Sequence, residues 1–386
     1  MKKKVLVLTD ELPWGHRSIA KSIYGYLKAR EKEGNIEVEF VQVKANIGIG
    51  FDAYNFIYKY WPSSNIVAHR LMHNETAREL FREMSVRNLP GLQKTVKWYK
   101  PDLIISAYFL HSNSLAKWKE NDRGLTWKLW TIVADPWTIN PISYVTGADK
   151  HIVYDKVGVE LAPKYGVAKE NVLATGWWTR EEMFKKYNKV EARKKLGIED
   201  DRPVIFVGGG SLGNSALPKI LPALMVVKRP VGMVFNAGTD KLALNLVTEF
   251  DKLYRKVKKD NLVKIVNYGW IENIAEVLAG VDIVFGKAGP NFLFDVVAAR
   301  KPFVAMMHIS GQEDGNLDII RKKKLGWIKE KSGELGDFMM EYLEDPEKYN
   351  QKFTATIEKE ARTNEGSLEK VWQELLKEMP TKSVSQ

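Results

Sequence analysis

The feature that most constrains the fold of this chain is a repeated alternation of short apolar runs with amphipathic segments. In the first half, each apolar run is followed by a stretch whose apolar residues recur with helical spacing. This order is typical of β-α-β units, in which helices cover a parallel sheet. We predict strands at 5–8, 36–43, 102–106, 129–134, 151–154 and 172–176, with intervening helices that include 18–32, 76–97 and 156–165.

The same alternation resumes after a charged stretch. We interpret residues 179–200 as a linker between a first lobe, residues 1–178, and a second lobe, residues 201–365. Residues 366–380 predict an amphipathic helix, which we expect to return to the first lobe. The predicted fold class is therefore α/β, with two Rossmann-like lobes whose parallel sheets face a central cleft. Strands of the second lobe are predicted around 203–208, 231–238, 263–270, 281–286 and 301–307.

Composition excludes several classes of site and compartment. The 386 residues include no cysteine, which excludes disulfides and thiolate metal sites. No apolar run reaches the roughly 18 residues of a membrane span, and the first apolar run is too short for a signal peptide. We expect a cytoplasmic protein. The net charge of +11, concentrated in residues 1–150, fits an anionic membrane, a phosphorylated substrate or solubility; we expect no nucleic-acid partner, because the basic residues do not cluster in a known module.

Glycines after the first strand of the second lobe predict a phosphate-binding turn. Gly209, Gly210 and Ser211 follow a strand and precede a helix, so backbone amides there could approach a diphosphate; a tight turn is the alternative. Further along, Trp270 follows another strand and could form a wall for a base, with the backbone of Ile271 meeting its edge. A core tryptophan is the alternative.

The segment from Lys287 to Asn316 carries the clearest binding pattern. Lys287 offers positive charge, Gly289 permits close backbone approach at a helix start, and Asp295 could accept hydrogen bonds from two ribose hydroxyls. One strand later, a polar loop can donate and accept hydrogen bonds to a sugar ring, through Gln312, Glu313 and Asn316. A solvated helix acid and a capped turn are the alternatives.

These motifs resemble a known family. KAGPNFLFD, SGQEDGN and NYGWIEN are similar to the donor-binding half of the monogalactosyldiacylglycerol synthase and processive diacylglycerol glucosyltransferase family, and more distantly to the N-acetylglucosaminyltransferase that makes lipid II. GHRSIAKSI, KPDLIIS, TIVADPWTINP and TGWW resemble its acceptor lobe. The resemblance implies a GT-B fold, an inverting mechanism and a UDP-sugar donor, with no metal or other cofactor. Pro290 and Phe292 depart from the family's glycine and threonine.

For the chemistry, the resemblance points to two residues of the first lobe. His16 matches the histidine that ends the family's glycine-rich loop, and Asp135 matches its threonine-aspartate motif; either could be the base. Aromatic residues among basic neighbours, including Phe51, Phe56 and Trp61, suggest contact with an anionic membrane surface or a lipid acceptor, and hence a peripheral position on its inner face. A helical hairpin packed on the lobe is the alternative.

Other functions stay open at this stage. A UDP-sugar 2-epimerase shares the predicted fold, and a relative that binds nucleotide-sugar or membrane without turnover would also fit the altered first loop. His69 and His73 are four residues apart on a predicted helix, but no glutamate follows the first one, so we expect no zinc site there. The hexose, the acceptor and the oligomeric state are not specified by these motifs.

Overall fold

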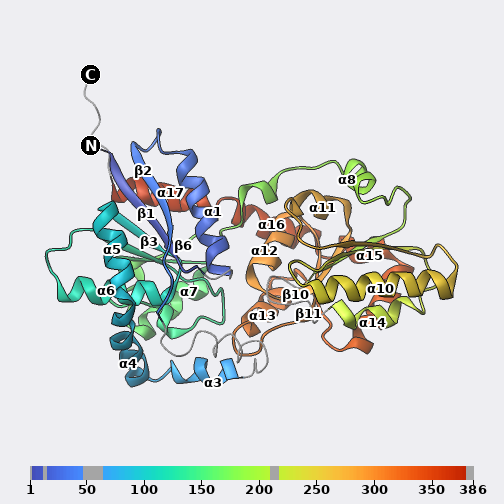
Figure 1. Cartoon of the computed structure of the whole chain (residues 1–386), viewed down its shortest axis with the longest axis horizontal. Helices are drawn as coiled ribbons and strands as arrows, with labels where there is room; N and C mark the ends of the chain where they lie inside the picture. Colours follow the sequence, from blue (N-terminus) through green and yellow to red (C-terminus); the bar gives the residue numbers. More distant parts are fainter. Residues whose placement is uncertain (1, 12–14, 47–63, 209–216, 380–386) are drawn as a thin grey trace. The chain divides into compact units, whose positions relative to one another are not determined.

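A computed structural model describes residues 2–11, 15–46, 64–208 and 217–379 of the chain (Figure 1). Six of the predicted site residues lie outside the described residues: Gly209, Gly210, Ser211, Phe51, Phe56 and Trp61. The chain divides into two compact units. The first comprises residues 1–179, 310–312 and 363–386, and the second comprises 180–309 and 313–362.

A six-stranded parallel sheet forms the centre of the first unit. Its strand order is β2-β1-β3-β4-β5-β6, so β1 pairs with both β2 and β3. Val5, Leu6 and Val7 of β1 are fully buried, as expected for a strand covered on both faces by helices. The strands are β1 Lys3–Thr9, β2 Ile36–Gln42, β3 Leu103–Ser106, β4 Lys128–Ile132, β5 Lys150–Val153 and β6 Val172–Ala174.

The helices of the first unit largely follow the predicted periodicity, with one exception. The stretch predicted as a single helix over 76–97 is broken into α4 Glu75–Ser85, a 3-10 turn η2 Val86–Asn88, and α5 Leu89–Tyr99. Pro90 begins the second helix, because proline fits a first turn but not a helix interior. The remaining helices are α1 Gly15–Ala29, α3 Ser64–Leu71, α6 Phe109–Asn121, α7 Lys156–Leu161 and α17 Ser367–Glu378.

The segment around α17 packs within the first unit. Asn364 Oδ1 accepts a hydrogen bond of 2.8 Å from the backbone amide of Trp177, and Ser367 Oγ donates to the Trp177 carbonyl at 2.7 Å. Tyr26 of α1 donates to Glu369 at 2.5 Å. These contacts tie the TGWW motif to residues 187 and 190 positions later in the chain, and α1 to a residue 343 positions later. The TGWW motif therefore has a structural role.

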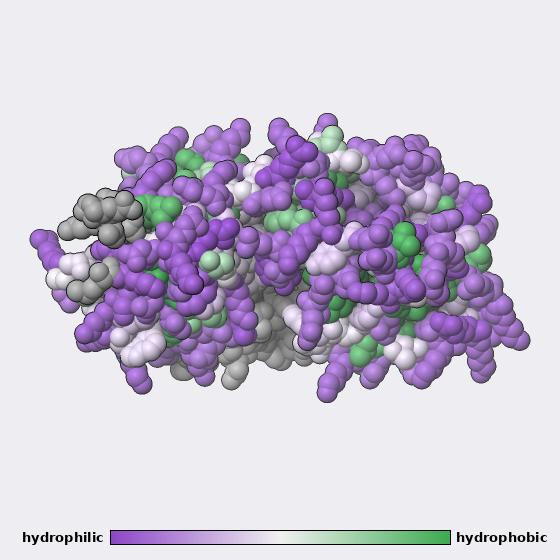
Figure 2. Space-filling model, turned by 90° about the horizontal axis from the view of Figure 1, so that it is seen from above, coloured by the Kyte–Doolittle hydropathy of each residue, from purple (hydrophilic) through white to green (hydrophobic). Residues whose placement is uncertain are grey.

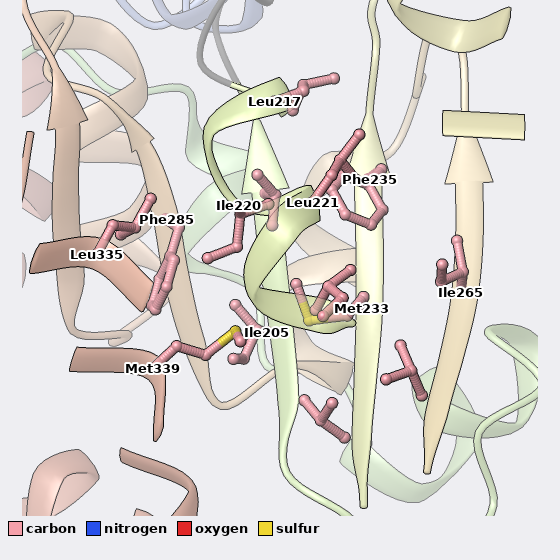
Figure 3. Packing of buried hydrophobic residues seen from close by; sticks show 14 of the residues in the cluster. Ile205, Leu217, Ile220, Leu221, Met233, Phe235, Ile265, Phe285, Leu335 and Met339 are labelled. Atoms are coloured by element: carbon pink, nitrogen blue, oxygen red, sulfur yellow. The ribbon is translucent and has the colours of Figure 1, made fainter. Parts of the chain in front are cut away.

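The second unit repeats the architecture. Its parallel sheet has the order β12-β11-β10-β7-β8-β9, and Figure 3 shows side chains of one buried cluster, such as Ile205, Met233 and Phe285, converging from three strands and the adjoining helices. Of the strands in the described residues, β12 is the one that was not predicted. The strands are β7 Val204–Gly208, β8 Val231–Asn236, β9 Val263–Tyr268, β10 Ile283–Lys287, β11 Phe303–Met307 and β12 Gly326–Ile328.

Residues 180–200 are part of the second unit and do not form the linker that we predicted. They contain a 3-10 turn, η6 Glu181–Phe184, and helix α8 Lys189–Lys195. Arg193 and Lys189 of α8 both form ion pairs with Asp282 at the start of β10, at 2.7 Å and 2.6 Å. The charged pattern thus reflects a surface helix fixed by ion pairs. The other helices are α9 Leu221–Leu224, α10 Lys241–Lys258, α11 Ile274–Gly280, α12 Pro290–Ala298, α13 Asp314–Lys322, α14 Ser332–Glu344, α15 Pro346–Gln351 and α16 Thr354–Glu365.

In the part of the chain that the structure describes, no helix combines the length and the apolar character needed to cross a bilayer. On the face shown in Figure 2, hydrophilic side chains predominate and apolar side chains occur in small separate groups.

Candidate functional site

Lys287, the last residue of β10, forms an ion pair with Glu313. Both side chains are largely buried, with exposed fractions of 14% and 6%. The other carboxylate oxygen of Glu313 accepts a hydrogen bond of 2.8 Å from the backbone amide of Ile309. Both oxygens of Glu313 therefore have partners within the protein, which gives the side chain a positioning role, and its predicted contact with the sugar stays a prediction.

Asn316 holds the loop that follows β10. Its side-chain amide donates to the Ala288 carbonyl at 2.7 Å, and the Ala288 amide donates to the Met307 carbonyl at 2.8 Å. Asn316 is buried. A buried amide with this partner shapes the lysine-glycine loop, and the predicted contact of Asn316 with the sugar stays a prediction.

Gly289 allows the loop to pack closely around the lysine. A Cβ atom at this position would lie 3.2 Å from Lys287 Nζ and 3.4 Å from Glu313 Oε1. Gly289 is the N-cap of α12, and Pro290 occupies the first turn. Because the first amides of a helix lack intrahelical partners and carry positive potential, this corner of the second unit suits an anion.

Asp295 lies on the second turn of α12. Its Oδ2 is 3.8 Å from Arg180 Nη2, and the side chain is 19% exposed. Burial raises the pKa of Asp295 to about 7; Arg180 partly opposes this effect, and Glu182 adds to it. The carboxyl group therefore exchanges its proton near neutral pH, which is unusual for an aspartate and common at functional sites.

Phe292, a departure from the family pattern, has a packing role. Its ring contacts Phe206 and Phe303, with centroid distances of 5.9 Å and 6.0 Å. A Cβ atom on Gly286 would lie 2.6 Å from the Phe292 ring. The ring thus fills the space that the strand glycine leaves open, and the threonine hydroxyl of the family has no counterpart here.

Trp270 is on the surface, not in the core. Its side chain is 69% exposed and lies beside a pocket formed by α8, α11 and the end of β9. In the sheet order, β9 is three strands away from β10, or about 14 Å at the usual strand spacing. The predicted role of Trp270 as a wall for a base stays a prediction. Ile271 also lines the pocket, with Tyr268, Leu196 and Val277.

Gln312 differs from its neighbours in the chain. It belongs to the first unit, whereas Glu313 and Asn316 belong to the second. The structure therefore brings together Lys287, Gly289, Glu313 and Asn316, while a donor contact by Gln312 stays a prediction.

His16, at the start of α1, packs against two aromatic rings of the first unit. Its ring lies edge-on to Tyr108 and Phe109, with centroid distances of 5.3 Å and 6.3 Å. Burial lowers the pKa of His16 to about 4, partly opposed by a hydrogen bond to the Ala107 backbone. Nδ1 is buried and has no hydrogen-bond partner among the described residues. The lowered pKa leaves the ring uncharged at neutral pH, as a general base has to be.

Asp135 lies on the segment after β4, and Trp137 holds this segment in place by a hydrogen-bonded contact. Trp137 Nε1 donates to both carboxylate oxygens of Asp155, at 3.1 Å and 3.2 Å, and Asp155 in turn caps α7 through the amide of Val157. In the sheet, β4 is two strands away from β1, which leads to His16. Because the strands are parallel, Asp135 and His16 follow the same edge of the first sheet.

Two histidines that sequence reasoning did not single out each make two polar contacts through their ring nitrogens. His111 is fully buried; its Nδ1 lies 2.8 Å from Asn88 Nδ2 and its Nε2 lies 2.8 Å from the Val43 carbonyl. Burial lowers the pKa of His111 to about 4, so it is a neutral structural residue. His308, directly after β11, contacts Glu330 at 2.7 Å and Asp314 at 3.1 Å. The sequence signal that could have identified His308 is its position directly after a predicted strand.

Metal-binding clusters are absent from the described part of the chain. No group of three or more His, Asp or Glu residues there is arranged to hold an ion. The pair His69 and His73 has ring centroids 5.3 Å apart, and His73 Nδ1 is 3.1 Å from the Tyr165 hydroxyl.

Comparison with known proteins extends the similarity over most of the chain. No family model matches it. It is 23% identical over 366 residues to a probable monogalactosyldiacylglycerol synthase of Nicotiana tabacum, covering 88% of this chain and 64% of that protein. The chain therefore spans less than two thirds of this plant relative. It is 22% identical over 358 residues to the processive diacylglycerol β-glucosyltransferase of Bacillus licheniformis, covering 90% and 89%.

A shorter match is to an N-acetylglucosamine transferase. The chain is 30% identical over 154 residues to the undecaprenol-linked N-acetylglucosamine transferase of Caldanaerobacter subterraneus, covering 38% of this chain and 39% of that protein.

Solved structures decide the fold. Anabaena HepE, in complex with UDP and glucose, superposes with a TM-score of 0.56 at 13% identity and covers 98% of this chain and 100% of its own. The chain has the GT-B glycosyltransferase fold. The UDP-GlcNAc 2-epimerase of Neisseria meningitidis gives a TM-score of 0.60 at 11% identity, covering 97% and 100%. The predicted fold class and the resemblance to glycosyltransferases are confirmed.

Proposed function

We propose that this protein is an inverting glycosyltransferase that moves a hexose from a UDP-sugar to a hydroxyl of a diacylglycerol-like lipid or another membrane-proximal acceptor. The observation that carries the proposal is the set formed by Lys287, Gly289 and Asp295 around the start of α12. It combines a cation, a close-packed helix N-terminus and a carboxyl group. Relatives whose names state transfer to diacylglycerol support the acceptor class.

In the proposed reaction, an acceptor oxygen attacks the anomeric carbon as the bond from that carbon to the UDP oxygen breaks. His16 or Asp135 takes the proton of the attacking hydroxyl. Lys287 and the amides at the start of α12 stabilise the negative charge that develops on the departing diphosphate, without a metal ion. One displacement inverts the anomeric configuration. For Lys287 to serve in this way, the diphosphate has to compete with Glu313 for its ammonium group.

The compartment proposed for this reaction follows from its acceptor. We place the protein in the cytoplasm, associated peripherally with the inner face of the membrane, since a UDP-sugar is supplied from the aqueous side and the acceptor from the lipid side. Fractionation of cells that express the full chain, with and without a high-salt wash, tests this placement. Recovery only in the soluble fraction at low salt would contradict it.

Binding of UDP tests the donor assignment. We expect UDP to raise the temperature of thermal unfolding, and Asp295→Ala and Lys287→Met to abolish most of this effect. Uridine, which lacks the diphosphate, should distinguish the two variants, because Lys287→Met removes the contact to the diphosphate, together with the ion pair to Glu313, and leaves the ribose contact of Asp295 in place. Lys331→Met is the matched control, since Lys331 is 83% exposed. Absence of any effect of UDP on the wild-type protein would contradict the donor assignment.

A UDP-sugar 2-epimerase is the second candidate, and the environment of His308 favours keeping it. The imidazole lies between two carboxylates, and the neighbouring strand β10 carries Lys287, so acid and base groups are present on the same edge of the second sheet. Incubation with UDP-N-acetylglucosamine in the absence of an acceptor separates the two candidates. Formation of an epimer would favour the epimerase, whereas turnover that requires an acceptor favours the transferase.

A further inference from the structure

One surface of the second unit exposes aliphatic side chains in a regular pattern. Along α10, four of them are unusually exposed: Leu242 at 81%, Leu246 at 42%, Leu253 at 53% and Val257 at 56%. At the usual 100° per residue, these positions fall within an arc of about 60° on the helix. They therefore lie on one side of the helix, as two pairs separated by two turns, and are called the α10 stripe below.

The α10 stripe is separate from the face by which the helix packs on its own unit. Ala243, Val247 and Tyr254 are the buried residues of α10, and they anchor it to the sheet and its connections. The exposed aliphatics thus add nothing to the core that these residues form. A row of exposed leucines on an already anchored helix is typical of an interaction surface.

The charged residues around the α10 stripe indicate which kind of surface the stripe binds. Five of the eight residues from 252 to 259 are lysine or arginine, against no acid in that interval. By helical spacing, Lys256 lies about 40° and Lys252 about 80° from the edge of the stripe on its solvent side, and both are exposed. Glu249, the acid nearest the stripe, is paired with Lys252 at 2.7 Å. Apolar side chains bordered by lysines match an anionic lipid surface, where the aliphatics enter the acyl boundary and the ammonium groups reach the phosphates.

We propose that α10 docks the second unit onto an anionic lipid bilayer through the α10 stripe, Leu242, Leu246, Leu253 and Val257, and its flanking lysines. The choice of a lipid surface as occupant rests on the proposed function, in which the acceptor is membrane-proximal. The surface itself is independent of the donor site, since α10 follows β8 and shares no residue with the set around Lys287. Donor binding and docking are therefore separable.

Vesicle binding by the full chain tests the proposal. We expect binding to vesicles of phosphatidylcholine mixed with phosphatidylglycerol, and little binding to phosphatidylcholine alone. Leu246→Ser/Leu253→Ser should weaken binding to the anionic vesicles by at least about tenfold, because the buried methylene groups are lost. Lys252→Gln/Lys256→Gln should weaken it by about fivefold for each lysine.

Matched controls come from the same unit. Val190→Ser removes an aliphatic side chain that is 76% exposed on α8, and Lys185→Gln/Lys186→Gln removes two exposed charges before that helix. Both should leave vesicle affinity unchanged. All variants should retain UDP protection against unfolding, so failure of docking and failure of the donor assignment give different results.

Three outcomes would overturn the proposal. The first is a wild-type protein that does not bind anionic vesicles. The second is vesicle binding that the α10 variants leave unchanged, which would assign the membrane contact to another surface. The third is a wild-type dimer in sedimentation that the leucine variant converts to a monomer, which would assign the α10 stripe to a second copy of the chain.

Discussion

Lys287 and Glu313 form a largely buried ion pair, and the second oxygen of Glu313 accepts the Ile309 amide. The carboxylate thus satisfies a charge and a backbone donor at once. Two residues that the motifs assigned to a ligand are, in this structure, each other's partners. Binding of a diphosphate would replace one anion by another beside Lys287, so the lysine keeps a negative partner in both states.

Glu313→Ala should destabilise the protein by about 3–5 kcal/mol, because it leaves a buried ammonium group and a buried amide without partners. Glu313→Gln should cost less, since its carbonyl can still accept from Ile309. Urea unfolding of both variants measures the difference. As a control, Lys287→Met/Glu313→Leu removes both charges and should lie closer to wild type. A free energy of unfolding for Glu313→Ala within about 1 kcal/mol of wild type would show that the pair does not form.

The raised pKa of Asp295, about 7, predicts pH-dependent donor binding. The carboxylate form accepts hydrogen bonds from ribose hydroxyls, whereas the protonated form accepts them less well. The affinity for UDP should therefore rise as pH increases from about 6 to 8, and titration calorimetry across this range measures it. Asp295→Asn should flatten this dependence. A wild-type affinity that is constant over the same range would contradict the assignment of Asp295 to the ribose.

The same group has an opposite effect on stability. Its folded-state pKa lies above the ordinary value of 3.8, so the folded protein binds the proton more tightly than the unfolded chain. The contribution of Asp295 to stability is therefore fully present below about pH 4 and is lost as pH rises through 7. Asp295→Asn should be more stable than wild type at pH 8, by up to about 4 kcal/mol. Equal stability at pH 8 would place the pKa near its ordinary value.

His16 and Asp135 are predicted to affect turnover without affecting the donor. His16→Ala or Asp135→Asn, whichever removes the base, should lower kcat by about 10²–10⁴-fold while the UDP dissociation constant stays within about twofold of wild type. Because burial lowers the pKa of His16 to about 4, a limb of the pH profile near 7 belongs to Asp295 and should persist in His16→Ala. If neither substitution lowers kcat by more than about tenfold, the base is another group.

Two glycines give a matched test of the connection between the TGWW motif and the end of the chain. Gly176 has φ of +98°, and a Cβ atom there would lie 2.8 Å from the Thr363 carbonyl oxygen, so Gly176→Ala should be strained and destabilising by roughly 1–3 kcal/mol. Gly25, inside α1, has nothing within 4 Å of a Cβ position. Gly25→Ala should be neutral or stabilising by up to about 1 kcal/mol. Equal effects in thermal unfolding would contradict this account.

Periodicity predicted the fold well because buried parallel strands are nearly continuous apolar runs. In the part of the chain that the structure describes, eleven of the twelve strands were recognised in this way, and β12 was missed. The prediction of a linker at residues 179–200 was wrong for a physical reason. Composition shows that residues 180–200 are charged, but the pairing of Arg193 and Lys189 with Asp282 depends on a residue about 90 positions later in the chain.

The sequence predicted which residues lie together in the site better than it predicted what each of them contacts. Lys287, Gly289, Glu313 and Asn316 do lie together, because they follow adjacent parallel strands. A motif gives residue types, however, and does not show that Glu313 turns toward Lys287 or that Asn316 turns toward Ala288. The raised pKa of Asp295 likewise depends on burial, which spacing along α12 does not reveal. The contributions of Trp270, Gln312 and Asp135 stay predictions.

Release of UDP tests the central claim most directly. The full-length protein is incubated with each of several UDP-hexoses and with vesicles that contain diacylglycerol, and free UDP is measured over time. We predict acceptor-dependent release of UDP from at least one donor, with formation of the matching glycolipid, and loss of both in Asp295→Ala. Absence of UDP release and glycolipid from every donor, by a wild-type protein that UDP protects against unfolding, would contradict the claim that it is a transferase acting on this lipid.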